Sequence, residues 1–243
     1  ENDRVIYLFI DEFTNFNDVP IGKKAVLLLN RLGYRIITLK HKNSGRPMLS
    51  KGFLGKARKL AKANVNLFAE YISEIEPLVG IEPSAIFTFR DEYPDLLRGE
   101  EKKKALELAK NTYTIEEFLA KEIEAEKLRA ELFTDEPRKV LFHGHCQQKA
   151  IATTKATKTI LGFPKNYAVE EIKSGCCGMA GSFGYEKEHY ELSMKIGELV
   201  LFPAVRNAEA ETILAAPGTS CRHQIKDGTG KIARHPIEVL YEA

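Results

Sequence analysis

Short apolar runs alternate with longer amphipathic segments along almost the whole chain, and this alternation restricts the fold more than any other feature. In the first half, apolar runs at residues 4–10, 35–40 and 77–83 are separated by segments with helical spacing at residues 21–34 and 50–76. Continuous apolar runs of this length are typical of buried parallel strands. Strands that alternate with helices form parallel sheets covered on both faces. The sequence therefore predicts an α/β fold.

The same order of elements restarts after a charged segment, residues 98–131, which is predicted to be helical with a solvated face. The second half has predicted strands within residues 139–145, 168–174 and 211–225, and predicted helices at residues 147–163 and 186–208. The long helix at 186–208 is expected to break at Pro203.

The two halves match in three places at offsets of 133 to 136 residues. The residues that fall opposite one another are Asp11 and Cys146, Asn43 and Cys176, Ser44 and Cys177, and Ala85 and Cys221. Three matches in one register indicate an internal repeat. We therefore expect two tandem Rossmann-like three-layer modules with parallel sheets, residues 1–135 and 136–243, related by a pseudo-twofold axis. The first module would have lost its cysteines.

Composition narrows the function classes. The 243 residues carry a formal net charge of only +2, which gives no charge-based reason to expect nucleic acid as a partner. No apolar run approaches the roughly 20 residues of a transmembrane helix. Four cysteines are too few for a disulfide scaffold, so reduced thiols in a cytoplasmic setting are expected. The chain starts at Glu1, which suggests a processed product or a piece of a longer protein.

The stretch SGCCGMAGSFG, residues 174–184, contains two adjacent cysteines. Adjacent cysteines rarely bond each other, because disulfide geometry strains the peptide between them. Cys146, Cys176, Cys177 and Cys221 each follow a predicted strand. Because the carboxyl ends of parallel strands line one edge of a sheet, the four thiols are expected to converge. Four soft sulfur ligands in one pocket predict a metal site.

The glycines around the adjacent pair have a predicted role in the same pocket. Gly175, Gly178 and Gly181 let backbone amides approach the sulfurs without a Cβ in the way. The loop also precedes a predicted helix near residue 186, and free amides at a helix start stabilise negative charge. Both effects favour the thiolate form of cysteine.

Two histidines beside the cysteines, His145 and His223, are candidates to complete the ligand set, and a hydrogen-bonding role in the pocket is the alternative for each. His143 is expected to do no more than tie down its loop.

Three occupants of the pocket remain open from the residues alone. A structural zinc site usually uses CxxC pairs, and the chain has none. An adjacent pair followed by glycine suits neighbouring iron atoms of a larger cluster, and four buried free thiols without metal are the third possibility. The regularly spaced glycines also suggest a nucleotide phosphate loop, but both the GxGxxG pattern and the P-loop lysine are missing.

The order Cys146, then Cys176, Cys177 and Gly178, then Cys221 resembles the cysteine-rich CCG domain of heterodisulfide reductase and of the iron–sulfur subunits of glycolate oxidase and lactate-utilisation enzymes. The segments HGHCQQKA, APGTSCRHQI and HPIEVL are similar to the C-terminal part of FAD-linked D-lactate or glycolate dehydrogenases. The resemblance extends over nearly the whole chain.

This resemblance implies an electron-transfer module of a FAD-linked 2-hydroxy acid dehydrogenase, with a [4Fe–4S] cluster, in this family a non-cubane one. It implies partners in the FAD-binding and ferredoxin-like domains of the same or a partner chain, and a location in the cytoplasm or at the inner membrane face. The fragment is expected to hold no catalytic residue of its own. A zinc-binding or metal-free docking module of the same multidomain protein is the alternative.

The chain departs from the resembled family in both halves. The family's fullest form carries CCG and CxxC in each half, but the first half here has no cysteine and Gln224 stands where the second half would need its fifth thiolate. No cluster is therefore expected in the first half. There Arg46 replaces Met179, and with Lys51 and Arg90 it is predicted to form a positive wall facing the cluster or a carboxylate.

Overall fold

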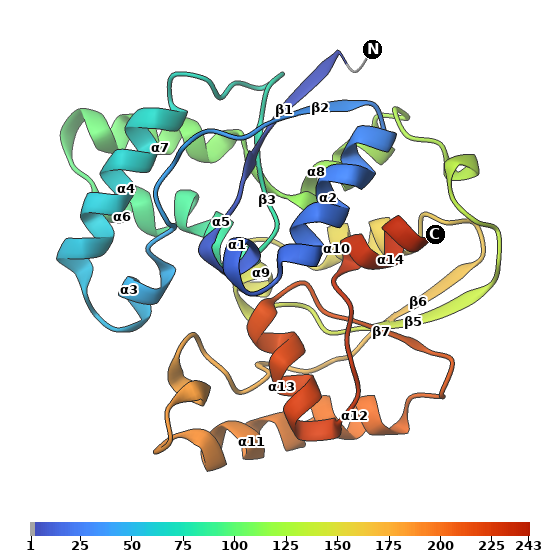
Figure 1. The fold of residues 1–243 in the computed structure, drawn as a ribbon. Coiled ribbons are helices and arrows are strands. Elements are labelled where there is room, and N and C mark those ends of the chain that lie inside the picture. Colours follow the sequence, from blue (N-terminus) through green and yellow to red (C-terminus); the bar gives the residue numbers. More distant parts are fainter. Residues whose placement is uncertain (1–2) are drawn as a thin grey trace. The chain divides into compact units, whose positions relative to one another are not determined.

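The computed structural model describes residues 3–243, which divide into two compact units, one ending at Phe118 and the other spanning Leu119–Ala243 (Figure 1). Each unit contains one sheet whose described strands all run parallel, with helices packed against it. The α/β prediction with two Rossmann-like modules is confirmed. The boundary at residue 135 and the pseudo-twofold axis stay predictions. No helix within residues 3–243 combines the length and the apolar character needed to cross a bilayer.

The first unit is built on a four-stranded sheet in the order β2-β1-β3-β4. Its strands are β1 (Arg4–Phe9), β2 (Tyr34–Ile37), β3 (Leu78–Gly80) and β4 (Thr112–Thr114). Its helices are α1 (Glu12–Phe16), α2 (Val19–Arg31), α3 (Arg46–Ser50), α4 (Leu54–Phe68), α5 (Pro83–Ile86), η1 (Phe87–Phe89), α6 (Glu92–Leu96) and α7 (Gly99–Lys110), and α8 (Ile115–Glu124) starts in this unit.

Alternate residues of β1 explain how this sheet is covered on two faces. Val5, Tyr7 and Phe9 pack into one core cluster with residues of α4, α6 and α7. Ile6 and Leu8 are also buried, and the period of two along a strand turns them to the opposite face. Figure 1 shows α4, α6 and α7 on one side of the strands, with α2 and α8 on the other.

The second unit has a three-stranded sheet in the order β6-β5-β7. An isolated parallel bridge joins Ala215 of β7 to Arg234, which takes the place that β4 has in the first sheet. Its strands are β5 (Arg138–Phe142), β6 (Tyr167–Glu171) and β7 (Ile213–Ala215). Its helices are η2 (Ala130–Leu132), α9 (Cys146–Ile151), α10 (Lys155–Leu161), η3 (Phe183–Tyr185), α11 (Tyr190–Leu199), α12 (Leu201–Asn207), α13 (Thr219–Thr229) and α14 (Pro236–Glu242).

The same alternation divides the core of the second unit. Val140 and Phe142 of β5 pack with Leu161 of α10 and Val239 of α14. Leu141, between them, packs on the other cluster, which includes residues of α12 and α13. Figure 1 shows α10 and α14 on one side of this sheet and α11, α12 and α13 on the other. The sheet is thus the middle of three layers, and its strand ends are left to carry a site.

Two predicted helices differ from the structure in instructive ways. The charged region at 98–131 contains the buried strand β4, because Thr112 and Thr114 have the β-branched side chains that suit a strand and β3 offers them a free edge. The helix predicted at 186–208 breaks at Val200, not at Pro203. Pro203 lies in the first turn of α12, where its missing N–H costs nothing.

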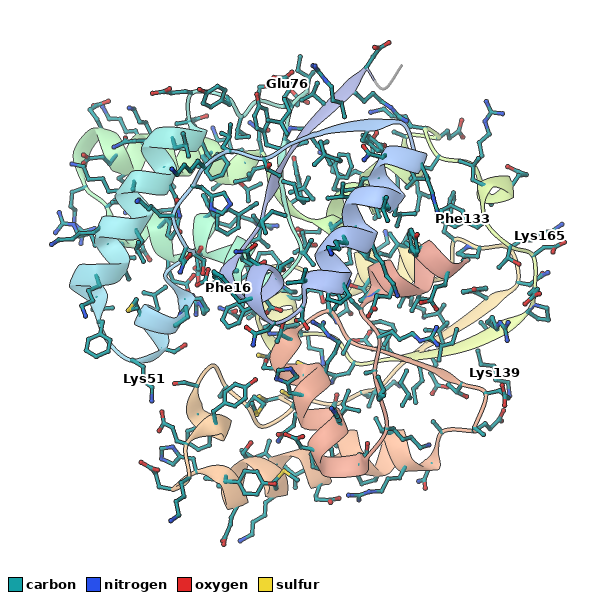
Figure 2. All side chains as sticks on the ribbon, viewed as in Figure 1. Phe16, Lys51, Glu76, Phe133, Lys139 and Lys165 are labelled. Atoms are coloured by element: carbon teal, nitrogen blue, oxygen red, sulfur yellow. The ribbon has the colours of Figure 1, made fainter. Side chains whose placement is uncertain are left out.

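The arginines predicted to form a positive wall are both ion-paired inside the first unit. Arg46 pairs with Glu92, and the Arg90 guanidinium lies 2.8 Å from both carboxylate oxygens of Glu117. Lys51 is exposed at the surface (Figure 2). The partners neutralise both guanidinium charges locally, which weakens the argument for a positive wall. That the wall faces a cluster stays a prediction.

Candidate metal centre

The four cysteines lie at the carboxyl ends of the three adjacent parallel strands of the second unit. Cys146 is the first residue of α9, the helix that follows β5 along the chain. Cys176 and Cys177 lie in the loop after β6, and Cys221 lies in the first turn of α13, after β7. Since β5 is the central strand, with β6 and β7 on its two sides, the three segments meet at one edge of the sheet.

The thiols form one hydrogen-bonded row in which Cys146 contacts Cys176, Cys176 contacts Cys177 and Cys177 contacts Cys221. All four are free cysteines; Cys177 and Cys221 are buried, and the other two are partly exposed. Hydrogen bonds from Cys146 and Cys177 lower the pKa of Cys176, and the hydrogen bond from Cys177 lowers that of Cys221. The pKa values of Cys146 and Cys177 rise because their thiols donate these bonds and are partly or fully removed from water. The row therefore favours thiolates at Cys176 and Cys221.

Backbone amides of the glycine-rich loop point at the sulfurs. The Gly178 N–H donates to Cys176 Sγ at 3.3 Å, and the Ala180 N–H also lowers the pKa of Cys176 by hydrogen bonding. Gly178 and Ala180 have φ values of 103° and 40°, in the left-handed region. A Cβ on Gly178 would lie 2.2 Å from the backbone oxygen of Ser193 in α11. The loop thus needs glycine here both for its turn and for its close approach to α11.

Gly175 and Gly181, also predicted to bind a cofactor, differ in their need for glycine: Gly181 has a left-handed backbone, and Gly175 does not. Gly181 has a φ of 70°, and a Cβ on Gly175 would have no atom within 4 Å. Lys149 of α9 holds the start of this loop, because its Nζ donates to the Ser174 carbonyl at 2.6 Å. The ammonium group anchors the loop to the helix that carries Cys146.

His143 lies closer to the sulfurs than the loop-tying role assigned to it from the sequence requires. Its side chain is fully buried, and its Nδ1 lies 2.7 Å from Ser174 Oγ. One nitrogen of its ring, the sulfur of Cys177 and the sulfur of Cys221 all lie within 4.8 Å of one another. The hydrogen bond that ties His143 to the loop at Ser174 is present, but the sequence did not predict that the imidazole approaches the sulfurs. The available signal was a histidine three residues before Cys146 at the end of a strand.

The two histidines singled out from the sequence have other contacts. His145 caps α9, where its Nδ1 accepts the Gln147 N–H at 3.2 Å. A Cβ on Gly218 would lie 2.3 Å from the His145 ring and 3.4 Å from Cys221 Sγ, so glycine leaves room for this ring beside the sulfur. His223 is partly exposed, and its Nδ1 lies 2.9 Å from the Tyr185 hydroxyl. Among residues 3–243 the group of ligand atoms that could hold a metal ion includes neither of them.

Gln224 stands where the resembled family has its last cysteine. Its Nε2 donates to the backbone oxygen of Ser193 at 3.1 Å and to the Ser193 hydroxyl at 3.0 Å. The same nitrogen would lie 2.9 Å from a Cβ on Gly178. Gln224 thus fastens α13 to α11 beside the cysteine loop, and its amide nitrogen is used in that contact.

The matching strand ends of the first unit carry oxygen atoms where the second unit has sulfur. Glu12, the first residue of α1, accepts the Ser44 N–H and hydroxyl, both at 2.8 Å. Asp11 caps α1 as His145 caps α9, so Glu12 and not Asp11 is the counterpart of Cys146 when helix starts are compared. The sequence match was therefore one residue out. The reason is that β1 and β5 begin 134 residues apart (138 − 4), as do α1 and α9 (146 − 12), whereas the match of Asp11 with Cys146 uses an offset of 135 (146 − 11).

Comparisons with known proteins give relatives over nearly the whole chain, although no protein-family model matches the sequence. The chain is 30% identical over 240 residues to D-2-hydroxyglutarate dehydrogenase of Escherichia coli (strain K12), covering 98% of this chain and 22% of that protein. It is 30% identical over 235 residues to a subunit of the anaerobic glycerol-3-phosphate dehydrogenase of the same strain, covering 95% of this chain and 57% of that subunit. It is 26% identical over 249 residues to lactate utilization protein A of Anoxybacillus flavithermus, covering 98% and 97%.

The chain thus spans about a fifth of the length of D-2-hydroxyglutarate dehydrogenase and just over half of the glycerol-3-phosphate dehydrogenase subunit. Two of these three relatives are dehydrogenases or dehydrogenase subunits by name, and the third is a lactate utilization protein. The similarity fits the expected likeness to the C-terminal part of FAD-linked dehydrogenases.

The ligand atoms that the structure brings together fit a metal centre. Four sulfurs lie in one row, loop amides are aimed at them, and the buried His143 Nε2 has no hydrogen-bond partner of regular geometry among the described residues. Soft thiolates with a single imidazole suit iron–sulfur clusters and zinc.

Proposed function

We propose that this chain is the iron–sulfur electron-transfer module of a FAD-linked 2-hydroxy acid dehydrogenase, with its thiols belonging to a cysteine-rich CCG domain. The observation that carries the proposal is the row of four cysteine sulfurs at one sheet edge. The similarity to D-2-hydroxyglutarate dehydrogenase and lactate utilization protein A supports a redox role. Oxidation of the hydroxy acid itself takes place at a flavin in another domain of the same or a partner chain.

In this proposal Cys146, Cys176, Cys177 and Cys221 hold the cluster. When bound, an iron–sulfur cluster supplies one-electron transfer. The amides of the glycine-rich loop donate to the sulfurs, and such hydrogen bonds stabilise negative charge and raise a cluster's reduction potential. The burial of Cys177 and Cys221 keeps water from that end of the row.

The first unit has no part in holding the cluster in this proposal. Its equivalent strand ends are closed by a carboxylate and a hydroxyl that already bond each other, and they offer no thiolate. It instead serves as a second α/β module for docking to the flavin or ferredoxin-like domains.

A zinc site is the second candidate, and one observation favours it. One nitrogen from His143 and the sulfurs of Cys177 and Cys221 lie within 4.8 Å of one another, close enough to surround a single tetrahedral ion. In this case the pair of modules would be a docking element without redox chemistry.

Metal and sulfide analysis of the protein purified without oxygen tests the proposal. We expect a brown protein with iron and acid-labile sulfide in near-equal amounts. Cys177→Ser should remove most of both, since it removes a central sulfur of the row. Ser44→Ala, the matched change in the first unit, should leave iron and sulfide unchanged. A colourless protein with at most one zinc would favour the second candidate, and one without bound metal would contradict both.

A further inference from the structure

The His143 imidazole is held in a fixed orientation beside the sulfurs of Cys177 and Cys221. It is fully buried, its backbone N–H donates to the Ala215 carbonyl at 2.9 Å, and its Nδ1 is fixed by Ser174 at 2.7 Å. Its Nε2 is buried and makes no hydrogen bond of regular geometry with the described residues. The ring does interact with the Cys221 thiol, and this interaction helps to lower the pKa of Cys221. A buried ring nitrogen turned toward sulfurs, with no nitrogen or oxygen partner among residues 3–243, calls for an explanation.

The hydrogen bonds of Ser174 indicate which ring nitrogen of His143 carries the proton. The Ser174 hydroxyl donates to the Ile172 carbonyl at 3.4 Å. Its proton is then used, so Ser174 Oγ accepts from His143 Nδ1–H. In this tautomer Nε2 carries a lone pair on the side of the ring that approaches Cys177 and Cys221. Metal-binding histidines are usually oriented in this way, by a hydrogen bond from the other ring nitrogen.

The other nitrogen groups near the sulfurs are committed elsewhere. His145 Nδ1 accepts a backbone N–H, so in the neutral ring its Nε2 carries the proton and cannot donate a lone pair. His223 Nδ1 is bonded to Tyr185, and the Gln224 amide donates to Ser193. The position of the missing fifth thiolate thus offers no ligand, whereas His143 Nε2 does.

We propose that His143 is a ligand of the metal centre, binding through Nε2 beside Cys177 and Cys221, and that Ser174 positions it. This inference deepens the proposed function, because it concerns the same site. The resembled family has a fifth cysteine where this chain has Gln224. In this inference the fifth ligand is instead the imidazole of His143, which follows β5 as Cys146 does. His143 would thereby give one end of the sulfur row a neutral nitrogen ligand.

Nitrogen hyperfine spectroscopy of the iron-loaded, reduced protein tests the ligand directly. Protein made with 15N-histidine should show a strong 15N coupling to the cluster spin, which His143→Ala abolishes. His223→Ala is the matched control and should leave the coupling unchanged. A spectrum without histidine coupling, or a coupling lost in His223→Ala but kept in His143→Ala, would overturn the inference.

Cobalt(II) titration under anaerobic conditions gives a second readout that needs no cluster. The wild-type protein should show thiolate-to-cobalt charge-transfer bands, and His143→Ala should weaken cobalt binding by more than about 100-fold. His143→Cys should restore binding with shifted d–d bands, because it replaces nitrogen with sulfur. Equal cobalt affinity and identical spectra in the wild type and His143→Ala would contradict His143 as a ligand.

Ser174→Ala covers the case in which His143→Ala does not fold. It leaves the imidazole in place but removes its orienting partner, so cobalt binding should weaken by about 10- to 100-fold. An unchanged affinity in Ser174→Ala would contradict the positioning role.

The outcomes separate this inference from the proposed function. Iron and sulfide without histidine coupling would leave the electron-transfer proposal standing and remove His143 from the ligand set. Cobalt or zinc bound through His143, with no iron or sulfide, would keep His143 as a metal ligand and overturn the electron-transfer proposal. A protein that binds neither cobalt nor a cluster would overturn both.

Discussion

Gly178 occupies a position in which a side chain would collide with the backbone of a neighbouring helix. Its φ is 103°, and a Cβ would lie 2.2 Å from the Ser193 oxygen. We therefore expect Gly178→Ala to lower the free energy of unfolding by roughly 3 kcal/mol or more. Gly175→Ala, in the same loop, should cost no more than about 0.5 kcal/mol, because no atom lies within 4 Å of its Cβ. Urea unfolding compares them, and equal costs would contradict the steric argument.

Asp11 is a buried carboxyl group whose ionisation opposes folding. Burial, and next the charge of Glu82, raise the pKa of Asp11 to about 7. Between its usual pKa near 4 and pH 7 the folded state binds more protons than the unfolded state. The free energy of unfolding should therefore fall as pH rises through this window, by roughly 1.4 kcal/mol per pH unit for this proton.

Asp11→Asn should remove this part of the pH dependence and still cap α1, since the amide oxygen can accept the Phe13 and Thr14 N–H groups. Urea unfolding at a series of pH values measures the slope. Asp227→Asn, at an exposed site, is the control for loss of one carboxylate. An Asp11→Asn protein with the wild-type slope would show that another group, such as the buried Glu116, whose pKa burial raises to about 8, dominates this window.

At the scale of the element, the helix after the last strand position of each sheet starts with the same capping arrangement. Thr114 and Glu117 bond each other's backbone N–H groups at the start of α8, and His235 and Glu238 form a capping box at the start of α14. The repeat thus extends to the last helix of each unit, beyond the three matches seen in the sequence. The two sheets are therefore followed by the same local structure, although the capping residue is Thr114 in one unit and His235 in the other.

Loss of the second capping box should destabilise α14. The His235 N–H donates to Glu238 Oε2 at 3.0 Å, so Glu238→Ala should lower the free energy of unfolding by about 1 kcal/mol. Glu238→Gln keeps an acceptor oxygen and should recover most of that loss. The urea midpoint measures both, and an equal loss in the two variants would mean that the charge, not the hydrogen bond, stabilises the helix.

At the scale of the whole molecule, metal should order the segments that carry the ligands. Hydrogen exchange followed by mass spectrometry should show slower exchange in residues 143–147, 174–181 and 219–224 of the metal-loaded protein. These segments form the strand-end pocket of the second unit, and binding stabilises only the state that has the pocket. Strands β1 and β3, which carry no cysteine, are the internal reference. Unchanged exchange in all three segments would contradict a metal site formed by them.

The sequence by itself determined the fold class and the approach of the cysteines to one another. Apolar runs that alternate with helical segments leave parallel sheets as the solution, and strand ends of such a sheet meet at one edge. Cys146, Cys177 and Cys221 therefore had to lie near one another once each was seen to follow a strand. The prediction needed only periodicity and chain order, which are local properties of the sequence.

Only the tertiary structure decided the features that depend on a partner far along the chain. β4 is a strand because β3 offers it an edge, although charged helical segments surround it in the sequence. Glu12 replaces Asp11 as the counterpart of Cys146 because the structure shows which residues cap α1 and α9 and which residues begin them. His143 faces the sulfurs because Ser174, 31 residues away, fixes its ring. Side-chain orientation is set by packing and hydrogen bonds between distant segments, which periodicity in the sequence does not encode.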